Sequence, residues 1–103
     1  MKMSVLSAMV AKEKNRNENM IAEYSRELET LPKGSIKSKT VKGRAYYYLT
    51  FRAGDKVVTK YIGKDEGLVV PMRGQLARRK QVEEILKKLR QEKAQIQKLE
   101  TVL

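Results

Sequence analysis

Three runs of alternating apolar and polar residues lie in the middle of the chain, between Gly34 and Gly63. β-Branched and aromatic residues are frequent in each run, and two short turn signals, Lys42–Gly43 and Gly54–Asp55, separate the runs. Runs of this kind, joined by two-residue turns that contain glycine, are typical of β-hairpins. The pattern therefore predicts a three-stranded antiparallel meander.

The two turns also set the pairing register of the predicted sheet. A two-residue loop at each turn fixes which residues lie opposite one another, and opposed residues share a face because side chains alternate along a strand. The predicted pairs on one face are Lys37 with Tyr48, Lys39 with Tyr46, and Tyr48 with Tyr61. The predicted pairs on the other face are Ile36 with Leu49, Phe51 with Val58, and Tyr47 with Ile62.

This register sorts the side chains into an apolar face and a polar face. The apolar face consists of Ile36, Tyr47, Leu49, Phe51, Val58 and Ile62, with Lys60 as its one charged member. The polar face consists of Lys37, Lys39, Tyr46, Tyr48, Thr50, Arg52, Thr59 and Tyr61. We expect Tyr47, Leu49 and Phe51 to pack, and we expect Tyr46 and Tyr48 to be more exposed.

The N-terminal flank of the predicted sheet falls into two parts. Residues 12–19 contain no apolar side chain, so we expect residues 1–19 to form a weakly ordered segment. From Met20 to Leu31, apolar residues recur at three- and four-residue steps, which predicts a helix. Asn17 or Asn19 is the expected N-cap of this helix.

The C-terminal flank predicts a longer helix, strong from Leu76 onward, with a heptad seam. The seam residues fall seven apart, at Val82, Leu89, Ile96 and Leu103. Two helices whose ends meet at one small sheet should return antiparallel. The sequence thus predicts an α+β fold for residues 20–103, taken as a single domain. In it a three-stranded antiparallel meander lies between two helices that form an antiparallel, coiled-coil-like hairpin.

The heptad seam is longer than the apolar stripe that the first helix offers between Met20 and Leu31. Ile96, Leu99 and Leu103 then have no obvious cover within the chain. Uncovered apolar seams favour association with a second copy. We therefore expect a homo-oligomer held together by these three residues.

The charge of the chain is strongly positive and unevenly spread. The formal net charge is +11. Residues 1–31 are balanced, with five cations and five anions, whereas residues 32–67 carry nine Lys and Arg against three Asp and Glu. A field of this kind favours polyanions, either nucleic acid or an anionic membrane surface. No stretch is long and apolar enough to predict a transmembrane segment, and we expect a nucleic-acid partner and no membrane partner.

Catalysis and metal binding have few candidate residues. The chain has no cysteine and no histidine, so the common nucleophiles, bases, thiolate metal ligands and disulfides are missing. Its two aspartates, Asp55 and Asp65, lie in predicted turns. We expect no enzyme activity, no metal, no cofactor and no small-molecule substrate. We expect a cytoplasmic, bacterial protein.

Two groups of residues are candidates for binding nucleic acid. Sheets that bind it use cations for phosphates and aromatic rings for stacking or groove contact. The first group has this mixture on the polar face: Lys37, Lys39, Tyr46, Tyr48, Arg52 and Tyr61. The second group, Arg78, Arg79 and Lys80, places three cations at the head of a predicted helix, where positive charge is unfavourable without a partner anion.

Both groups also have a purely structural interpretation. Lysines protect the exposed edges of small sheets from pairing with other chains, and cross-strand tyrosine pairs add stability. The helix cations are equally compatible with the solvated face of a coiled coil. The charge of the chain favours nucleic acid for the sheet group, whereas the solvated face is the stronger interpretation of the helix group.

One part of the sequence resembles known families. The strings L-P-K-G-S-I, V-K-G-R-A-Y-Y-Y-L-T-F-R and K-Y-I-G-K-D-E, followed by a charged heptad helix, resemble an uncharacterised short bacterial domain family over residues 28–100. More loosely, the meander is similar to the arm-type DNA-binding domain of tyrosine-recombinase integrases. That resemblance implies a three-stranded sheet placed against the DNA major groove. The N-terminal helix and the absence of a recombinase catalytic domain depart from the integrase pattern.

These observations lead to one expected function and one alternative. We expect a non-catalytic accessory protein that binds nucleic acid, DNA in preference to RNA, through a basic, tyrosine-rich sheet face. The alternative is a coiled-coil oligomerisation or protein-adaptor module with no nucleic-acid role. The placement of the cations separates the two, because a binder needs them on one continuous surface.

Overall fold

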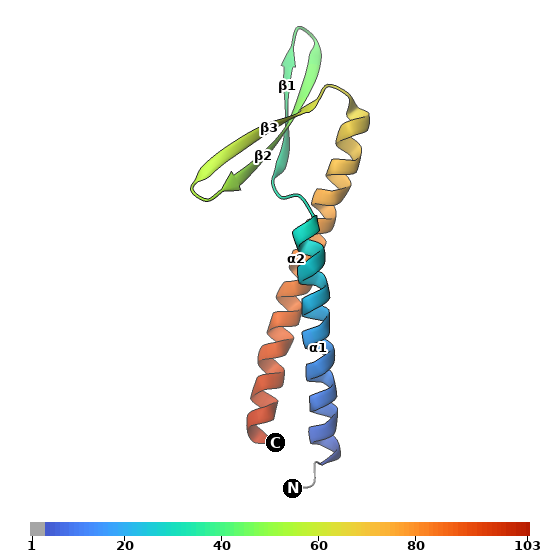
Figure 1. Cartoon of the computed structure of the whole chain (residues 1–103), viewed down its shortest axis with the longest axis vertical. Helices are drawn as coiled ribbons and strands as arrows, with labels where there is room; N and C mark the ends of the chain where they lie inside the picture. The colour runs from blue at the N-terminus through green and yellow to red at the C-terminus, as the bar shows by residue number, and fades with distance from the viewer. Residues whose placement is uncertain (1–3) are drawn as a thin grey trace. The chain divides into compact units, whose positions relative to one another are not determined.

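A computed structural model describes residues 4–103 (Figure 1). The elements are α1 (Val5–Thr30), β1 (Ser35–Val41), β2 (Arg44–Ala53), β3 (Lys56–Gly63) and α2 (Glu66–Val102). The predicted α+β fold, with a three-stranded antiparallel sheet between two helices, is confirmed. Backbone contacts group the chain into two compact units. The helical unit contains α1 and residues 81–103, and the sheet unit contains residues 31–80.

The first helix begins well before its predicted start. α1 begins at Val5 rather than near Met20 and runs through the polar stretch without a break. Ser4 is its N-cap, because the Ser4 Oγ accepts a hydrogen bond from the Ser7 N–H at 3.0 Å. The prediction of a cap at Asn17 or Asn19 is therefore wrong, and both residues lie inside the helix.

Polar residues at inward positions concealed the first half of α1 from the sequence pattern. The less exposed side chains of α1 form two rows of heptad spacing: Val10, Asn17 and Tyr24 in one, and Ser7, Lys14, Ile21 and Leu28 in the other. Asn17 is only 1% exposed. A search for apolar rows cannot find a seam whose buried position is Asn17 and whose partly buried positions include Ser7 and Lys14.

In the helical unit, α1 and residues 81–102 of α2 lie side by side and antiparallel (Figure 1). The buried apolar side chains follow the predicted seam and are Val82, Leu86, Leu89 and Ile96. Ile96 is only 7% exposed, so the expectation that it lacks cover within the chain is wrong. Leu99 and Leu103 are about half-exposed, as expected. The longer α1 explains the difference, because it extends the packing by several turns.

The first hairpin of the sheet unit has the predicted register at every paired position. Strand order is β1-β2-β3, and Lys37 lies opposite Tyr48 while Ile36 lies opposite Leu49. Lys42 and Gly43 have φ angles of 52° and 79°. Two successive positive φ angles are the backbone of a type I′ turn, whose twist matches that of the flanking strands.

The second hairpin follows the prediction near its turn and departs from it farther away. Phe51 lies opposite Val58, and Tyr48 lies opposite Tyr61, as predicted. Tyr47, however, lies opposite Gly63 and not opposite Ile62. The register shifts by one residue there, which leaves Ile62 as the extra residue of a β-bulge in β3.

The second helix also begins earlier than its predicted strong segment. α2 begins at Glu66, and the Asp65 Oδ1 accepts a hydrogen bond from the Gly67 N–H at 2.9 Å, which caps the first turn. Pro71 lies inside α2, where its ring nitrogen cannot donate to the Gly67 carbonyl. Residues 63–67 are therefore the end of β3, a cap and the first turn of α2.

The sheet unit buries few apolar side chains. Leu49 is 8% exposed and Val69 is fully buried, while Phe51 is half-buried. The one charged residue of the apolar face, Lys60, places its Nζ 5.6 Å from the centre of the Phe51 ring. A cation over a ring face is a favourable contact, which explains why a lysine is tolerated on this face.

Candidate nucleic-acid interface

The three strands bring cations and tyrosines together on the polar face. Tyr48 lies on the central strand β2, between Lys37 on β1 and Tyr61 on β3. The Tyr48 and Tyr61 ring centres are 5.4 Å apart, with an angle of 56° between the ring planes. The Lys39 Nζ lies 5.9 Å from the Tyr48 ring centre. Lys39, Tyr48 and Tyr61 therefore form one connected cluster of positive charge and aromatic rings within the predicted polar face.

The exposure of this cluster differs from strand to strand. Lys37, Lys39 and Arg52 are exposed, and Tyr61 is 56% exposed. Tyr46 and Tyr48 are half-buried. Tyr47, on the opposite face, is half-buried as well, so the contrast that we expected between Tyr47 and its two neighbours is not present.

The tyrosines of the cluster differ in how open their rings are to a ligand. Tyr48 has its ring occupied, by Tyr61 on one side and by the Lys39 ammonium above it. Such contacts at an exposed site contribute about 0.5–1 kcal/mol each, so they also stabilise the sheet without any ligand. Tyr61 is the more open ring and is the one placed to stack on a base or to contact a groove.

The helix group Arg78, Arg79 and Lys80 lies in a different setting from the one predicted. Because α2 begins at Glu66, these residues lie about three turns into the helix and not at its head. The expected electrostatic penalty at a helix N-terminus therefore does not apply to them. Arg78 and Arg79 are half-buried, and only Lys80 is exposed.

Arg79 has a structural role within the sheet unit. Its Nη1 donates a hydrogen bond of 2.8 Å to the carbonyl oxygen of Leu31, the first residue after α1. A half-buried guanidinium that bonds a backbone carbonyl is poorly placed to contact a phosphate. The polar face is consequently the better candidate for a nucleic-acid interface.

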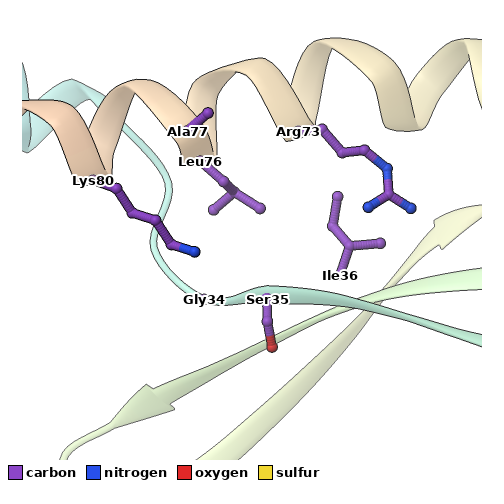
Figure 2. Close-up of a pocket in the computed structure, with 7 residues that line it drawn as sticks. All are labelled: Gly34, Ser35, Ile36, Arg73, Leu76, Ala77 and Lys80. Carbon is purple, nitrogen blue, oxygen red and sulfur yellow. The ribbon is translucent and has the colours of Figure 1, made fainter.

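The sequence pattern did not indicate a groove that lies between β1 and residues 73–80 of α2, all within the sheet unit (Figure 2). Its walls come from residues 34–36 and from Arg73, Leu76, Ala77 and Lys80. The helix residues are spaced at i, i+3, i+4 and i+7, the spacing of one helix face. That spacing was visible in the sequence, but nothing local indicated that this face lies along a strand.

A metal site and a membrane-spanning helix have no candidate in the part of the chain that the structure describes. Within residues 4–103, the acidic side chains form no group of three that could hold a metal ion. Neither described helix is long and apolar enough to cross a bilayer.

Comparison with known proteins finds one family. Residues 10–69 match the family described as Domain of unknown function (DUF6788), and the match runs from α1 through the sheet to the first residues of α2. The expected resemblance to an uncharacterised domain family is confirmed, although the match begins and ends earlier than residues 28–100. No curated protein and no solved structure matches the chain.

Proposed function

We propose that this chain, which belongs to the DUF6788 family, is a non-catalytic accessory protein that binds nucleic acid through the polar face of its sheet. The observation that carries the proposal is the strand register, which gathers Lys37, Lys39, Tyr48 and Tyr61 on one surface. Cations beside exposed aromatic and hydroxyl groups are the chemistry by which sheets contact phosphates and bases.

The distribution of charge between the two units supports this proposal. The sheet unit, residues 31–80, contains thirteen Lys and Arg and only three Asp and Glu. The remainder of the chain contains ten Lys and Arg and nine Asp and Glu. Nearly all of the excess positive charge therefore lies in the unit that contains the polar face. Such a local field attracts polyanions and accelerates their association.

DNA is the preferred nucleic acid in this proposal, with the cytoplasm as the place of action. The sheet resembles the arm-type domain of tyrosine-recombinase integrases, in which three strands lie against the DNA major groove. In the same arrangement, Lys37, Lys39 and Arg52 would contact phosphates, and Tyr61 would contact base edges or the groove wall. Phosphate contacts would supply most of the affinity, and base contacts would supply the sequence preference.

A salt-series titration tests the proposal. Wild-type protein is titrated with duplex DNA, single-stranded DNA and RNA of equal length at several salt concentrations. The test variant carries Lys37→Ala, Lys39→Ala and Arg52→Ala, which removes three exposed cations from the polar face. Its control carries Lys87→Ala, Lys88→Ala and Arg90→Ala, which removes three exposed cations from α2.

The expected result is weaker binding and a flatter salt dependence for the sheet variant alone. Each lost phosphate contact should remove about 0.9 from the slope of log K against log salt. Both variants should fold, because all six side chains are exposed. If the α2 variant loses binding and the sheet variant does not, the polar face is not the interface. If wild-type protein binds no nucleic acid at low salt, the proposed function is wrong.

A second candidate function is a coiled-coil oligomerisation or adaptor module. The observation that favours it is a set of exposed apolar side chains at the end of the helical unit, which includes Leu6, Met9, Leu99 and Leu103. Exposed apolar side chains gathered in one region are typical of protein–protein contacts. A chain that forms oligomers and ignores nucleic acid in the same titration would fit this candidate.

A further inference from the structure

The groove between β1 and α2 combines an apolar floor with positive charge, and we refer to it as the β1–α2 groove. It has a volume of about 370 Å³ and is lined by Gly34, Ser35, Ile36, Arg73, Leu76, Ala77 and Lys80. All of these residues belong to the sheet unit. Figure 2 shows Ile36 and Leu76 extending into the space between β1 and α2 from its two sides.

One wall of the groove is a strand with a free edge. β1 lies at the end of the strand order and pairs only with β2 among the described residues. Alternate residues of an edge strand therefore direct their backbone N–H and C=O groups away from the sheet. No residue of β2 or β3 lines the groove, and the strand residues that do are Ser35 and Ile36, at the start of β1. An extended segment placed there would find backbone partners along one side.

The β1 wall of the groove begins at Gly34, where the backbone conformation requires glycine. Gly34 has a φ angle of 120°, and a Cβ built on it would overlap the carbonyl oxygen of Thr50. Only glycine allows the chain to approach β2 so closely at this point. The backbone at the entrance of the groove is thus held in place by the sheet itself.

The opposite wall carries two cations that bracket the apolar floor. Arg73 and Lys80 are exposed and lie seven residues apart on α2, a distance of about 10 Å along the helix axis. Leu76 and Ala77 lie between them on the same face. Neither cation makes an ion pair with any residue in the described part of the chain. The groove is therefore positive at both ends and apolar in the middle.

We propose that the β1–α2 groove binds an extended acidic peptide segment, which adds to β1 as a fourth strand. Main-chain hydrogen bonds to the edge of β1 would give affinity, and alternate side chains of the segment would face α2. Side chains that face the same way along a strand are about 7 Å apart. A segment of about five residues thus fits, with an apolar side chain over Leu76 and acidic side chains two residues to each side.

The strand edge and the apolar floor, together with the two cations, favour a peptide over the polyanion that we propose for the polar face. Phosphates would meet Arg73 and Lys80, but a phosphate backbone has no group that pairs with a strand edge or fills an apolar floor. A peptide with one apolar and two acidic side chains uses all three features. The inference does not depend on nucleic-acid binding. A peptide would use the backbone of β1 and the side chains that line the groove, whereas the polar face would use the side chains of Lys37, Lys39 and Arg52.

A direct binding titration tests the inference with the full chain. The probe is a fluorescent peptide with blocked ends and the core Glu-Thr-Leu-Thr-Glu, and its anisotropy is followed as protein is added. Three control peptides separate the contributions. One replaces both Glu with Lys, one replaces Leu with Ser, and one carries N-methyl groups at alternate backbone positions. A single-stranded RNA oligonucleotide of equal net charge is the fourth control.

The expected result is saturable binding of the acidic peptide. Each control peptide should bind at least about tenfold more weakly. The protein variant Arg73→Glu with Lys80→Glu should lose the acidic peptide and gain the Lys peptide. Its matched control, Lys87→Glu with Lys88→Glu, makes the same change of charge elsewhere on α2 and should bind as wild type does.

Several outcomes would overturn the inference. Equal binding of the N-methylated peptide would exclude strand addition, and stronger binding of the RNA would make the groove a nucleic-acid site. Because Arg73 and Lys80 are exposed, their double variant should fold, and circular dichroism checks this. If the variant folds and keeps wild-type affinity, the groove is not the binding site. The Lys37, Lys39 and Arg52 variant should still bind the peptide, so failure of either proposal is distinguishable.

Discussion

The helical unit and the sheet unit solve the same problem of stability in different ways. In the helical unit, charges of both signs are balanced, and a row of buried seam residues, Val82, Leu86, Leu89 and Ile96, holds α1 and α2 together. In the sheet unit, positive charges greatly outnumber negative ones, and the buried apolar residues are Leu49 and Val69. The helical unit is stabilised mainly by the packing of apolar side chains. The sheet unit carries a net positive charge, and the self-repulsion of this charge opposes its folding.

This difference is the physical reason for assigning the proposed function to the sheet unit. Unbalanced charge costs stability through self-repulsion, and a small sheet with few buried side chains has little stability to lose. A partner anion on the sheet would remove this cost, whereas the helical unit has no comparable need. The comparison can be tested by changing one unit at a time.

The largest expected effect concerns the end of the helical unit. We predict that Leu99→Glu with Leu103→Glu converts an oligomer to a monomer, because both side chains are about half-exposed and apolar. Sedimentation of wild type and variant at roughly tens of micromolar would measure this. Truncation after residue 90 is unsuitable, because it would also remove the buried Ile96. A monomeric wild type would show that the helical unit is complete within one chain.

A smaller effect is expected from a substitution that creates a cavity in the heptad seam. Leu86 is 1% exposed, so Leu86→Ala should lower the free energy of unfolding by about 2–5 kcal/mol. Leu99→Ala removes the same atoms from a half-exposed position on the same helix and should cost much less. Denaturant titrations followed by circular dichroism would compare them. Equal losses would contradict the packing described for the helical unit.

A gain in stability is expected at Asn17. Its Nδ2 donates a hydrogen bond of 2.9 Å to the Leu89 carbonyl, but its Oδ1 has no hydrogen-bond partner among the described residues. An unsatisfied buried polar atom costs about 1–3 kcal/mol, and the Nδ2 hydrogen bond offsets about 0.5–1.5 kcal/mol of this, so Asn17→Val should raise the free energy of unfolding by about 1 kcal/mol. The same denaturant titration measures it.

The physical role of Asn17 suggests a second measurement on that variant. A single asparagine in a heptad seam fixes the register and the number of helices at a cost in stability. Asn17→Val should therefore broaden the distribution of oligomers in sedimentation. A variant that is less stable than wild type, with an unchanged oligomer, would show that Asn17 contributes only through its hydrogen bond.

The smallest expected effect is at the ion pair between Lys14 and Glu100. The Lys14 Nζ lies 3.2 Å from the Glu100 carboxylate, and both side chains are more than one-third exposed. Exposed pairs contribute about 0–1 kcal/mol, so Glu100→Gln should change the unfolding free energy little, and less still at high salt. A large loss would mean that charge, and not only the apolar seam, holds the helical unit together.

The sequence by itself determined the elements whose signals are local. The register of the first hairpin followed from the turn at Lys42–Gly43, because the type I′ turn and the alternation of side chains act over a few residues. The seam of α2 followed from heptad spacing for the same reason. The polar face was therefore predictable, residue by residue, from the turns outward.

Only the tertiary structure decided the features that depend on residues far apart in the chain. Asn17 faces inward because it bonds the carbonyl of Leu89, and Arg79 is committed to the carbonyl of Leu31. The β1–α2 groove likewise exists only where a helix face meets a strand edge. Such contacts leave no periodic trace in the sequence, because a polar side chain satisfied by a distant backbone group looks the same as one that faces water.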